Sequence, residues 1–203
     1  MAFPLTLDKY LYAVAKETAR LSWPGRMHPI LTAGAKYDTE GYFISPGFRT
    51  ELHEVWVGNV DDYDSWHQKR VVELGESIAN RVTLYNAQDA CYCSRTVAAK
   101  LMNAFMYQLM KYKECRYLWE HLHLVLDGKI FAALRTLARN NIALEPLYDI
   151  LRKNPYTISL KEYQLVQEHL RKFIEELNSR SNKEFRLTSP IELNLLWADG
   201  HKS

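Results

Sequence analysis

The 203-residue chain has little cysteine, little glycine and no excess of charge of one sign. Its three cysteines, Cys91, Cys93 and Cys115, are an odd number at uneven spacing, which is a poor disulfide framework and favours a reducing cytoplasm. The 26 Lys and Arg against 24 Asp and Glu give a net charge of +2. This balance excludes a global electrostatic attraction to nucleic acid or anionic lipid, so any such interaction needs a local patch.

Long apolar runs and glycine-rich loops are also missing. No stretch approaches the roughly 20 apolar residues of a membrane helix, and the N-terminal stretch carries acidic residues where a signal peptide has none. The eight glycines form no phosphate-binding loop or dinucleotide fingerprint, and no Ser or Cys lies in a nucleophile turn. We therefore expect a soluble, cytoplasmic protein without a cofactor and without a membrane partner.

Apolar residues at helical spacing dominate what the sequence does contain. A hydrophobic content of 47% with 12% aromatic residues is enough to bury one core, so we expect a single domain over residues 1–203. Apolar positions recur every three or four residues over several segments, which predicts helices. These segments are Leu7–Leu21, Asp61–Tyr85, Ser94–Tyr112, Cys115–Leu126, Lys129–Ala138, Glu145–Lys153, Ser159–Asn178 and a short one within Ser189–Gly200.

Residues 22–60 are the least regular part of the sequence. They hold five of the eight glycines, and two short pieces, Tyr42–Ile44 and Leu52–Val57, are rich in aromatic and β-branched residues. This composition predicts an insertion that is irregular or forms a two-stranded β element near residues 40–58. The predicted fold class is therefore mostly α, with six to eight helices around one core.

A basic and aromatic run, YQLMKYKECRYLW at residues 107–119, is the main candidate for a binding surface. Cations that grip phosphates beside rings that stack on bases suit single-stranded DNA or RNA. The candidate binding residues are Lys111, Lys113, Arg116, Tyr112 and Tyr117, and Lys100, Lys129, Arg135 and Arg139 could extend the patch. The alternative is a solvated basic face whose aromatic side chains point into the core.

Zinc is the metal that the cysteines and histidines could bind. The possible ligands are Cys91, Cys93, Cys115, His121 and His123, but their spacing matches no pair of zinc knuckles. We therefore expect free thiols and no metal site.

Arg116 and His121 are five positions apart in Arg-Tyr-Leu-Trp-Glu-His. This pattern resembles the Arg-x4-His signature of HEPN-type ribonucleases, which are small helical proteins. The resemblance implies RNA cleavage by the arginine and histidine of two protomers that meet at a dimer interface, and histidine suits this role because it titrates near neutrality. Tyr117 stands where that family commonly has a polar residue. The alternative places Arg116 on a solvated face and His121 in the core.

A second pattern combines Arg95-Thr96 and Leu101-Met-Asn103 with Val125-Leu-Asp127-Gly-Lys-Ile-Phe131 at a predicted helix start. It resembles the segment around the catalytic aspartate in the helix-hairpin-helix DNA glycosylase superfamily. The resemblance implies a helical scaffold and gives Asp127 the place of the acid that stabilises the sugar cation after base flipping. The glycine-rich hairpin turn of that superfamily is absent before Arg95, and no lysine nucleophile is evident. As an alternative, Asp127 caps the helix that follows it.

These patterns support three hypotheses about function. The first is a non-catalytic binding protein that contacts DNA or RNA through the face from Lys111 to Arg116. The second is an enzyme that processes nucleic acid, either ribonuclease-like through Arg116 and His121 or glycosylase-like through Asp127. The third is a protein-interaction module or a homodimer, which would expose an apolar patch with a polar rim.

Overall fold

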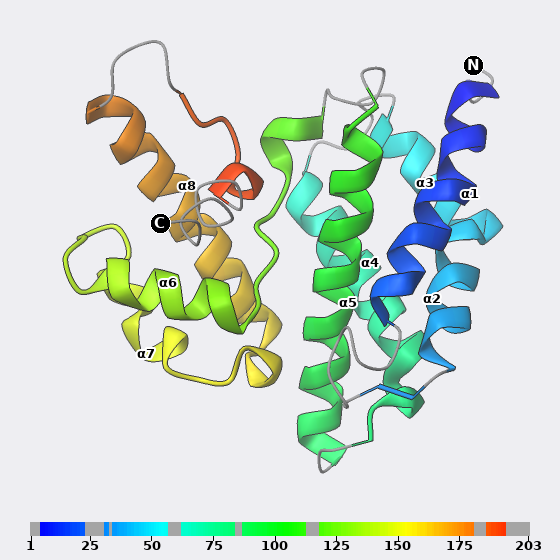
Figure 1. Cartoon of the computed structure of the whole chain (residues 1–203), viewed down its shortest axis with the longest axis horizontal. Coiled ribbons are helices and arrows are strands. Elements are labelled where there is room, and N and C mark those ends of the chain that lie inside the picture. Colours follow the sequence, from blue (N-terminus) through cyan, green and yellow to red (C-terminus); the bar gives the residue numbers. More distant parts are fainter. Residues whose placement is uncertain are drawn as a thin grey trace, which may run out of the picture. The chain divides into compact units, whose positions relative to one another are not determined.

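The computed structural model describes residues 5–22, 31–32, 34–56, 62–83, 87–112, 118–180 and 186–193. The contacts divide the chain into two compact units, residues 1–118 and 119–203, where the length alone suggests one domain. Both units are helical (Figure 1), and the described residues form eight α-helices and no strand beyond an isolated bridge between Leu31 and Val82. The predicted mostly α fold is confirmed. None of the described helices is both long and apolar enough to cross a membrane.

Four helices form a ring in the first unit: α1 (Leu5–Ala19), α2 (Ala35–Ile44), α4 (Tyr63–Ile78) and α5 (Ala87–Met110). α1 and α4 each contact both α2 and α5. Figure 1 shows α1 and α4 running in one direction and α2 and α5 in the other, so neighbours in the ring are antiparallel. α3 (Pro46–Trp56) follows α2 directly. The unit is therefore a four-helix bundle in which α2 and α3 together make one side.

The predicted β element near residues 40–58 is wrong where the structure describes the chain. Tyr42–Ile44 forms the end of α2, and Leu52–Val57 falls in α3 up to Trp56. Tertiary burial outweighs β propensity here, because α2 and α3 place apolar residues at helical spacing in the core. The buried residues are Phe43, Phe48, Leu52 and Val55.

The break between α2 and α3 follows from Ser45-Pro46. The backbone of Ser45 is extended, with φ −63° and ψ 146°, as expected for a residue that precedes proline. Pro46 then begins α3, where its missing N–H costs nothing. The Ser45 hydroxyl accepts a hydrogen bond from the Phe48 N–H at 3.3 Å. A single serine therefore ends one helix and caps the next.

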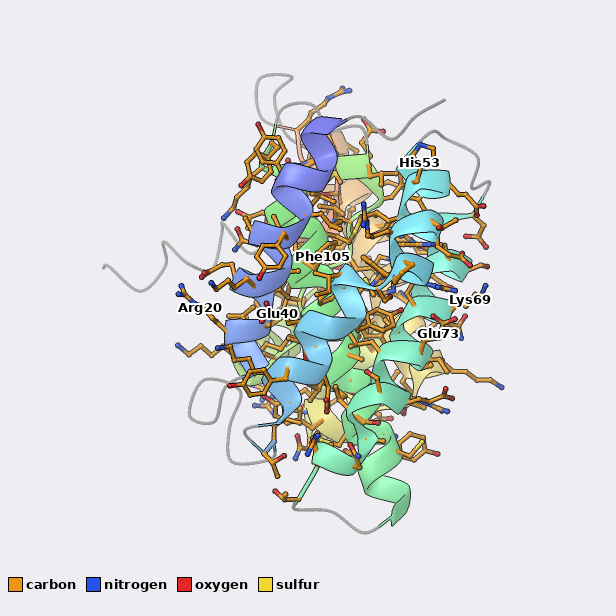
Figure 2. The ribbon with its side chains drawn as sticks, turned by 90° about the vertical axis from the view of Figure 1, so that its right-hand side faces the viewer. Arg20, Glu40, His53, Lys69, Glu73 and Phe105 are labelled. Atoms are coloured by element: carbon orange, nitrogen blue, oxygen red, sulfur yellow. The ribbon has the colours of Figure 1, made fainter. Side chains whose placement is uncertain are left out.

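Aromatic rings from several helices fill the centre of the first unit. The ring of Phe43 stacks on that of Phe105, with centroids 4.2 Å apart and planes 6° from parallel. Phe48 packs edge-on against both of them and lies beside Trp66. Figure 2 shows Phe105 inside the bundle. These four residues come from α2, α3, α4 and α5, so one cluster ties the bundle together.

α4 and α5 approach each other closely at two points. Gly75 lies against Arg95, since a Cβ atom on Gly75 would come within 3.1 Å of Arg95 Cγ. The buried pair His67 and Asn103 is hydrogen-bonded, with Nε2 and Oδ1 2.7 Å apart. A buried polar pair that is satisfied in this way fixes the register of two helices without a large desolvation cost.

The second unit is built around its longest helix, α8 (Leu160–Arg180). α8 begins with a capping box: the Ser159 N–H donates to Glu162 Oε2 at 2.8 Å, and the Glu162 N–H donates to Ser159 Oγ at 3.2 Å. The remaining elements are short. They are α6 (Gly128–Ala138), α7 (Tyr148–Leu151) and the 3-10 turns Glu145–Leu147, Pro155–Thr157 and Pro190–Glu192.

The predicted helix over Cys115–Leu126 is wrong in its described part. Residues 118–121 form one 3-10 turn, residues 122–127 are extended, and residues 113–117 lie outside the described chain. The buried side chain of Gln167 holds the extended segment in place. Its Oε1 accepts from the Leu124 N–H and its Nε2 donates to the Leu124 carbonyl, both at 2.9 Å. This amide clasp replaces the hydrogen bonds that a helix would have formed.

A second amide clasp lies further along α8. Asn178 Nδ2 donates to the Leu187 carbonyl at 2.7 Å, and Asn178 Oδ1 accepts from the Leu187 N–H at 3.0 Å. Gln167 and Asn178 are eleven residues apart, which returns to nearly the same side of an α-helix. One side of α8 therefore anchors two extended segments through side-chain amides.

The aromatic cluster predicts the largest stability effect in the first unit. Phe105→Ala should lower the free energy of unfolding by about 3–5 kcal/mol, because it removes a fully buried ring and leaves a cavity between α2, α3 and α5. Urea unfolding followed by circular dichroism measures the loss. Tyr12→Ala, which truncates an exposed ring on α1, should stay within about 0.5 kcal/mol of the wild type. Equal effects of the two substitutions would contradict this packing.

The Gln167 clasp gives a matched test in the second unit. Gln167→Ala should cost about 2–4 kcal/mol, because it leaves the N–H and the carbonyl of Leu124 buried without their partner. Exposed Glu168→Ala on the next position is the control. Hydrogen exchange at the Leu124 amide should accelerate in the Gln167 variant and not in the control, and unchanged exchange would disprove the clasp.

Candidate functional site

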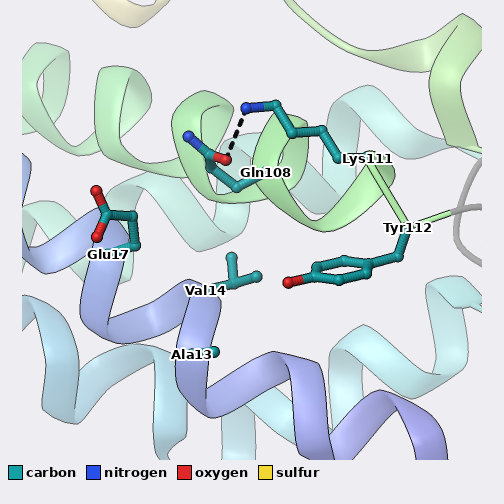
Figure 3. Close-up of a pocket in the computed structure, with 6 residues that line it drawn as sticks. All are labelled: Ala13, Val14, Glu17, Gln108, Lys111 and Tyr112. Atoms are coloured by element: carbon teal, nitrogen blue, oxygen red, sulfur yellow. Dashed lines mark hydrogen bonds between the residues drawn. The ribbon is translucent and has the colours of Figure 1, made fainter.

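A cleft of about 290 Å³ opens between α1 and the end of α5 in the first unit (Figure 3). α1 contributes one wall with Ala13, Val14 and Glu17, and α5 with the two residues after it contributes the other. The second wall consists of Gln108, Lys111 and Tyr112. The cleft thus combines two small apolar side chains, an aromatic ring, an amide, a carboxylate and an ammonium group.

Helical spacing explains why these side chains share the cleft. Ala13 and Glu17 lie one turn apart on α1, as Gln108 and Lys111 do at the end of α5. Residues 111 and 112 leave the helix in a tight turn, because the Lys111 N–H bonds the Gln108 carbonyl at 3.4 Å and the Tyr112 N–H bonds that of Leu109 at 3.2 Å. A cation at this end of a helix also meets the negative end of its dipole.

Two tyrosines stack beside the cleft. The ring of Tyr112 lies against that of Tyr10 on α1, with centroids 3.9 Å apart and planes 22° from parallel. Both side chains are half-buried. Figure 3 shows the Tyr112 hydroxyl pointing toward Val14. The stack orders the ring of Tyr112 against α1 in the absence of a ligand.

Lys111 is the exposed cation of the cleft. Its Nζ donates to Gln108 Oε1 at 2.9 Å and lies 4.8 Å from the centroid of the Tyr107 ring. At an exposed position such a cation–π contact contributes about 0.5–1 kcal/mol. Lys111 is thereby held beside Gln108 and the Tyr107 ring, while it stays open to solvent.

Glu17 brings the only carboxylate among the described residues that line the cleft. Its Oε2 accepts from Arg20 Nη1 at 3.0 Å, and both side chains are more than half exposed. A surface pair of this kind contributes little to stability. Its main effect is to orient the carboxylate along α1.

The structure brings together only part of the predicted binding residues. Lys111 and Tyr112 line one cleft, whereas Lys113, Arg116 and Tyr117 lie outside the described chain. Lys100 lies on the side of α5 that Lys111 follows, about 16 Å before Lys111 along the axis. Lys129 and Arg135 belong to α6 in the second unit, and Arg139 is the C-cap residue that follows it.

Sequence reasoning missed the α1 side of the cleft. Tyr10, Val14 and Glu17 recur at the spacing of one helix face, which indicates a shared side but not the element that this side meets. Gln108 lies within the basic and aromatic run, but nothing about this residue alone indicated a binding role. Only the packing of α1 on α5 identifies these four residues as one site.

The candidate catalytic residues occupy other places. Asp127 is the N-cap of α6, and its Oδ1 accepts from the N–H groups of Lys129 and Ile130, both at 2.9 Å. His121 is exposed in the turn over residues 118–121, and Arg116 lies outside the described residues. Asp127 therefore has the structural role that we gave as its alternative, while a catalytic role for these three residues stays a prediction.

The possible zinc ligands show no cluster in the part of the chain that the structure describes. Cys91 is exposed and Cys93 is buried on α5. His123 is buried in the second unit, with Nδ1 3.2 Å from the Tyr163 hydroxyl. Cys115 lies outside the described residues.

A charged cluster on the other side of the bundle is structural. Arg70 on α4 is only 4% exposed, and its Nη2 pairs with Glu73 at 2.8 Å and with Glu51 on α3 at 3.5 Å. The Tyr42 hydroxyl lies 3.1 Å from the Arg70 carbonyl oxygen and 3.3 Å from Glu73 Oε2. Burial raises the pKa of the Tyr42 hydroxyl well above its usual value, and this effect outweighs the opposite effect of the nearby Arg70 cation. The cluster joins α2, α3 and α4.

Comparison with known proteins finds no match: no protein-family model, curated protein or solved structure is significantly similar to this chain. The two resemblances stay local sequence patterns. Function therefore has to be argued from the cleft itself.

The two described cysteines should differ sharply in reactivity. Burial raises the pKa of the Cys93 thiol to about 11, so at pH 8 about one thousandth of it is thiolate, the reactive form. Iodoacetamide at pH 8 should alkylate exposed Cys91 and spare Cys93, with fragment-ion mass spectrometry assigning the sites. Alkylation in urea is the control, since both thiols should then react. Equal labelling in the native protein would contradict the burial of Cys93.

Proposed function

We propose that this chain is a non-catalytic protein that binds single-stranded nucleic acid at the cleft between α1 and α5. The observation that carries the proposal is the meeting of an exposed cation, Lys111, with the ordered ring of Tyr112 in one cleft. Lys111 contacts a phosphate, and the tyrosine provides a face for a base. Both residues belong to the run that predicts nucleic-acid binding from sequence alone.

Several features of the cleft favour this ligand over others. Its volume of about 290 Å³ is at the small end for ligand sites, which suits one base rather than a larger molecule. A net charge of +2 gives little long-range attraction, so affinity depends on local contacts and ring stacking. A duplex hides its base faces, and it therefore binds more weakly than a single strand.

The test is fluorescence anisotropy with labelled single-stranded and duplex oligonucleotides of RNA and DNA at 50 mM salt. Single strands should bind saturably, and binding should weaken about 2- to 3-fold from 50 to 200 mM salt, as expected for the one phosphate contact of Lys111. Lys111→Ala and Tyr112→Leu should each weaken binding about 5- to 20-fold, since each removes one phosphate contact or one stacking face.

Lys36 and Tyr37 provide a matched control. They form a second lysine and tyrosine pair, with Nζ 5.7 Å from the ring centroid, on α2 and outside the cleft lining. Lys36→Ala and Tyr37→Leu should leave binding unchanged. The proposal fails if no single strand binds saturably at low salt, or if the control pair matters as much as Lys111 and Tyr112.

A further inference from the structure

We infer that the cleft prefers guanine among the bases, an inference that rests on the proposed function and adds a ligand class to it. The observation behind it is the pairing of the Glu17 carboxylate with the Gln108 amide on facing walls of the same cleft. Together they present an acceptor group and a donor group to the edge of a base whose face lies on Tyr112. Neither residue is needed for stacking or for contact with a phosphate.

The amide of Gln108 has a defined orientation. Lys111 Nζ can only donate, so the Gln108 oxygen must face it, as the 2.9 Å contact shows. The amide nitrogen then points away from Lys111 (Figure 3). Among the described residues, Nε2 has no hydrogen-bond partner, so its two N–H groups stay available to a ligand.

The carboxylate of Glu17 keeps accepting capacity as well. Arg20 occupies Oε2, and no bond to Oε1 is formed by any residue in the described part of the chain. An ionised carboxylate has about four acceptor positions. The contact with Arg20 therefore leaves room for two further donors, which is what a bidentate contact with a base edge requires.

Guanine matches this pair of groups better than the other bases. Its N1–H and N2–H₂ are adjacent donors for one carboxylate, and the neighbouring O6 accepts from an amide N–H. Adenine and cytosine offer one amino group beside a ring acceptor, so they make a single bond to a carboxylate. Uracil and thymine place a carbonyl on each side of their one N–H, which brings oxygen toward the carboxylate. Carboxylate and amide side chains are general readers of such edges.

The experiment uses RNA strands of eleven nucleotides that differ only at the central position. This position is guanosine, inosine, adenosine or uridine, with five uridines on each side. A matching DNA series with thymidine flanks shows whether the sugar contributes. The guanosine strand should bind about tenfold more tightly than the all-uridine strand, which is at the low end for a bidentate contact. Inosine lacks the N2 amino group and should lose most of this advantage.

Glu17→Gln should abolish the difference in affinity between the guanosine strand and the inosine strand. Arg20→Gln removes the ion pair but keeps the carboxylate, so it should retain the preference. Glu175→Gln changes an exposed carboxylate on α8 and is the matched control. The comparison of bases with wild-type protein needs no variant, so the inference is tested even if a variant misfolds.

The outcomes separate the two proposals. Absence of saturable binding by every strand overturns nucleic-acid binding and the guanine preference together. Saturable binding with equal affinity for guanosine, inosine and uridine overturns the guanine preference alone. A guanosine preference that survives in Glu17→Gln also overturns it, because the carboxylate then plays no part in recognition.

Discussion

Burial of α5 is the constraint on which the first unit depends. This helix of 24 residues contacts both α1 and α4, and its residues Val97, Leu101, Phe105 and Leu109 have no exposed surface. A helix that is apolar over so much of its circumference has to be surrounded. The other helices of the unit cover α5, and α2 and α3 contact it through the rings of Phe43 and Phe48.

The cleft lies where this burial ends. Leu109 and Met110 have no exposed surface, while Lys111, the next residue, is exposed. Val14 belongs to both regions, because it is 4% exposed and also lines the cleft. The polar side chains of the cleft thus lie directly beside the packed core. This support keeps Gln108 and Tyr112 in fixed positions, which lowers the entropy that a ligand has to overcome on binding.

Periodicity predicted the long helices well and failed where tertiary contacts decide the backbone. The predicted helices over Asp61–Tyr85, Ser94–Tyr112 and Ser159–Asn178 correspond to α4, α5 and α8, and Asp127 caps α6, the alternative that its local sequence allowed. The segment around Leu52 looked like a strand because β-branched and aromatic residues fit either state. Leu124 looked helical because nothing in its own neighbourhood indicates the distant Gln167. Lys111 and Tyr112 were found because they are adjacent, whereas Glu17 was missed because its partner wall is about 90 residues away in sequence.

The two amide clasps on α8 give the second unit an unusual kind of alignment. In a sheet, many ladder bonds share the task of keeping a strand in register, but here one glutamine aligns residues 122–127 and one asparagine aligns residues 186–188. Leu122, His123, Leu124 and Leu126 are all buried along the first segment. A slip by one position would separate the Leu124 backbone from Gln167 and the His123 ring from the Tyr163 hydroxyl. A short insertion or deletion between residues 122 and 127 is therefore more damaging than a change of one exposed side chain elsewhere, since it displaces these buried residues and both contacts together.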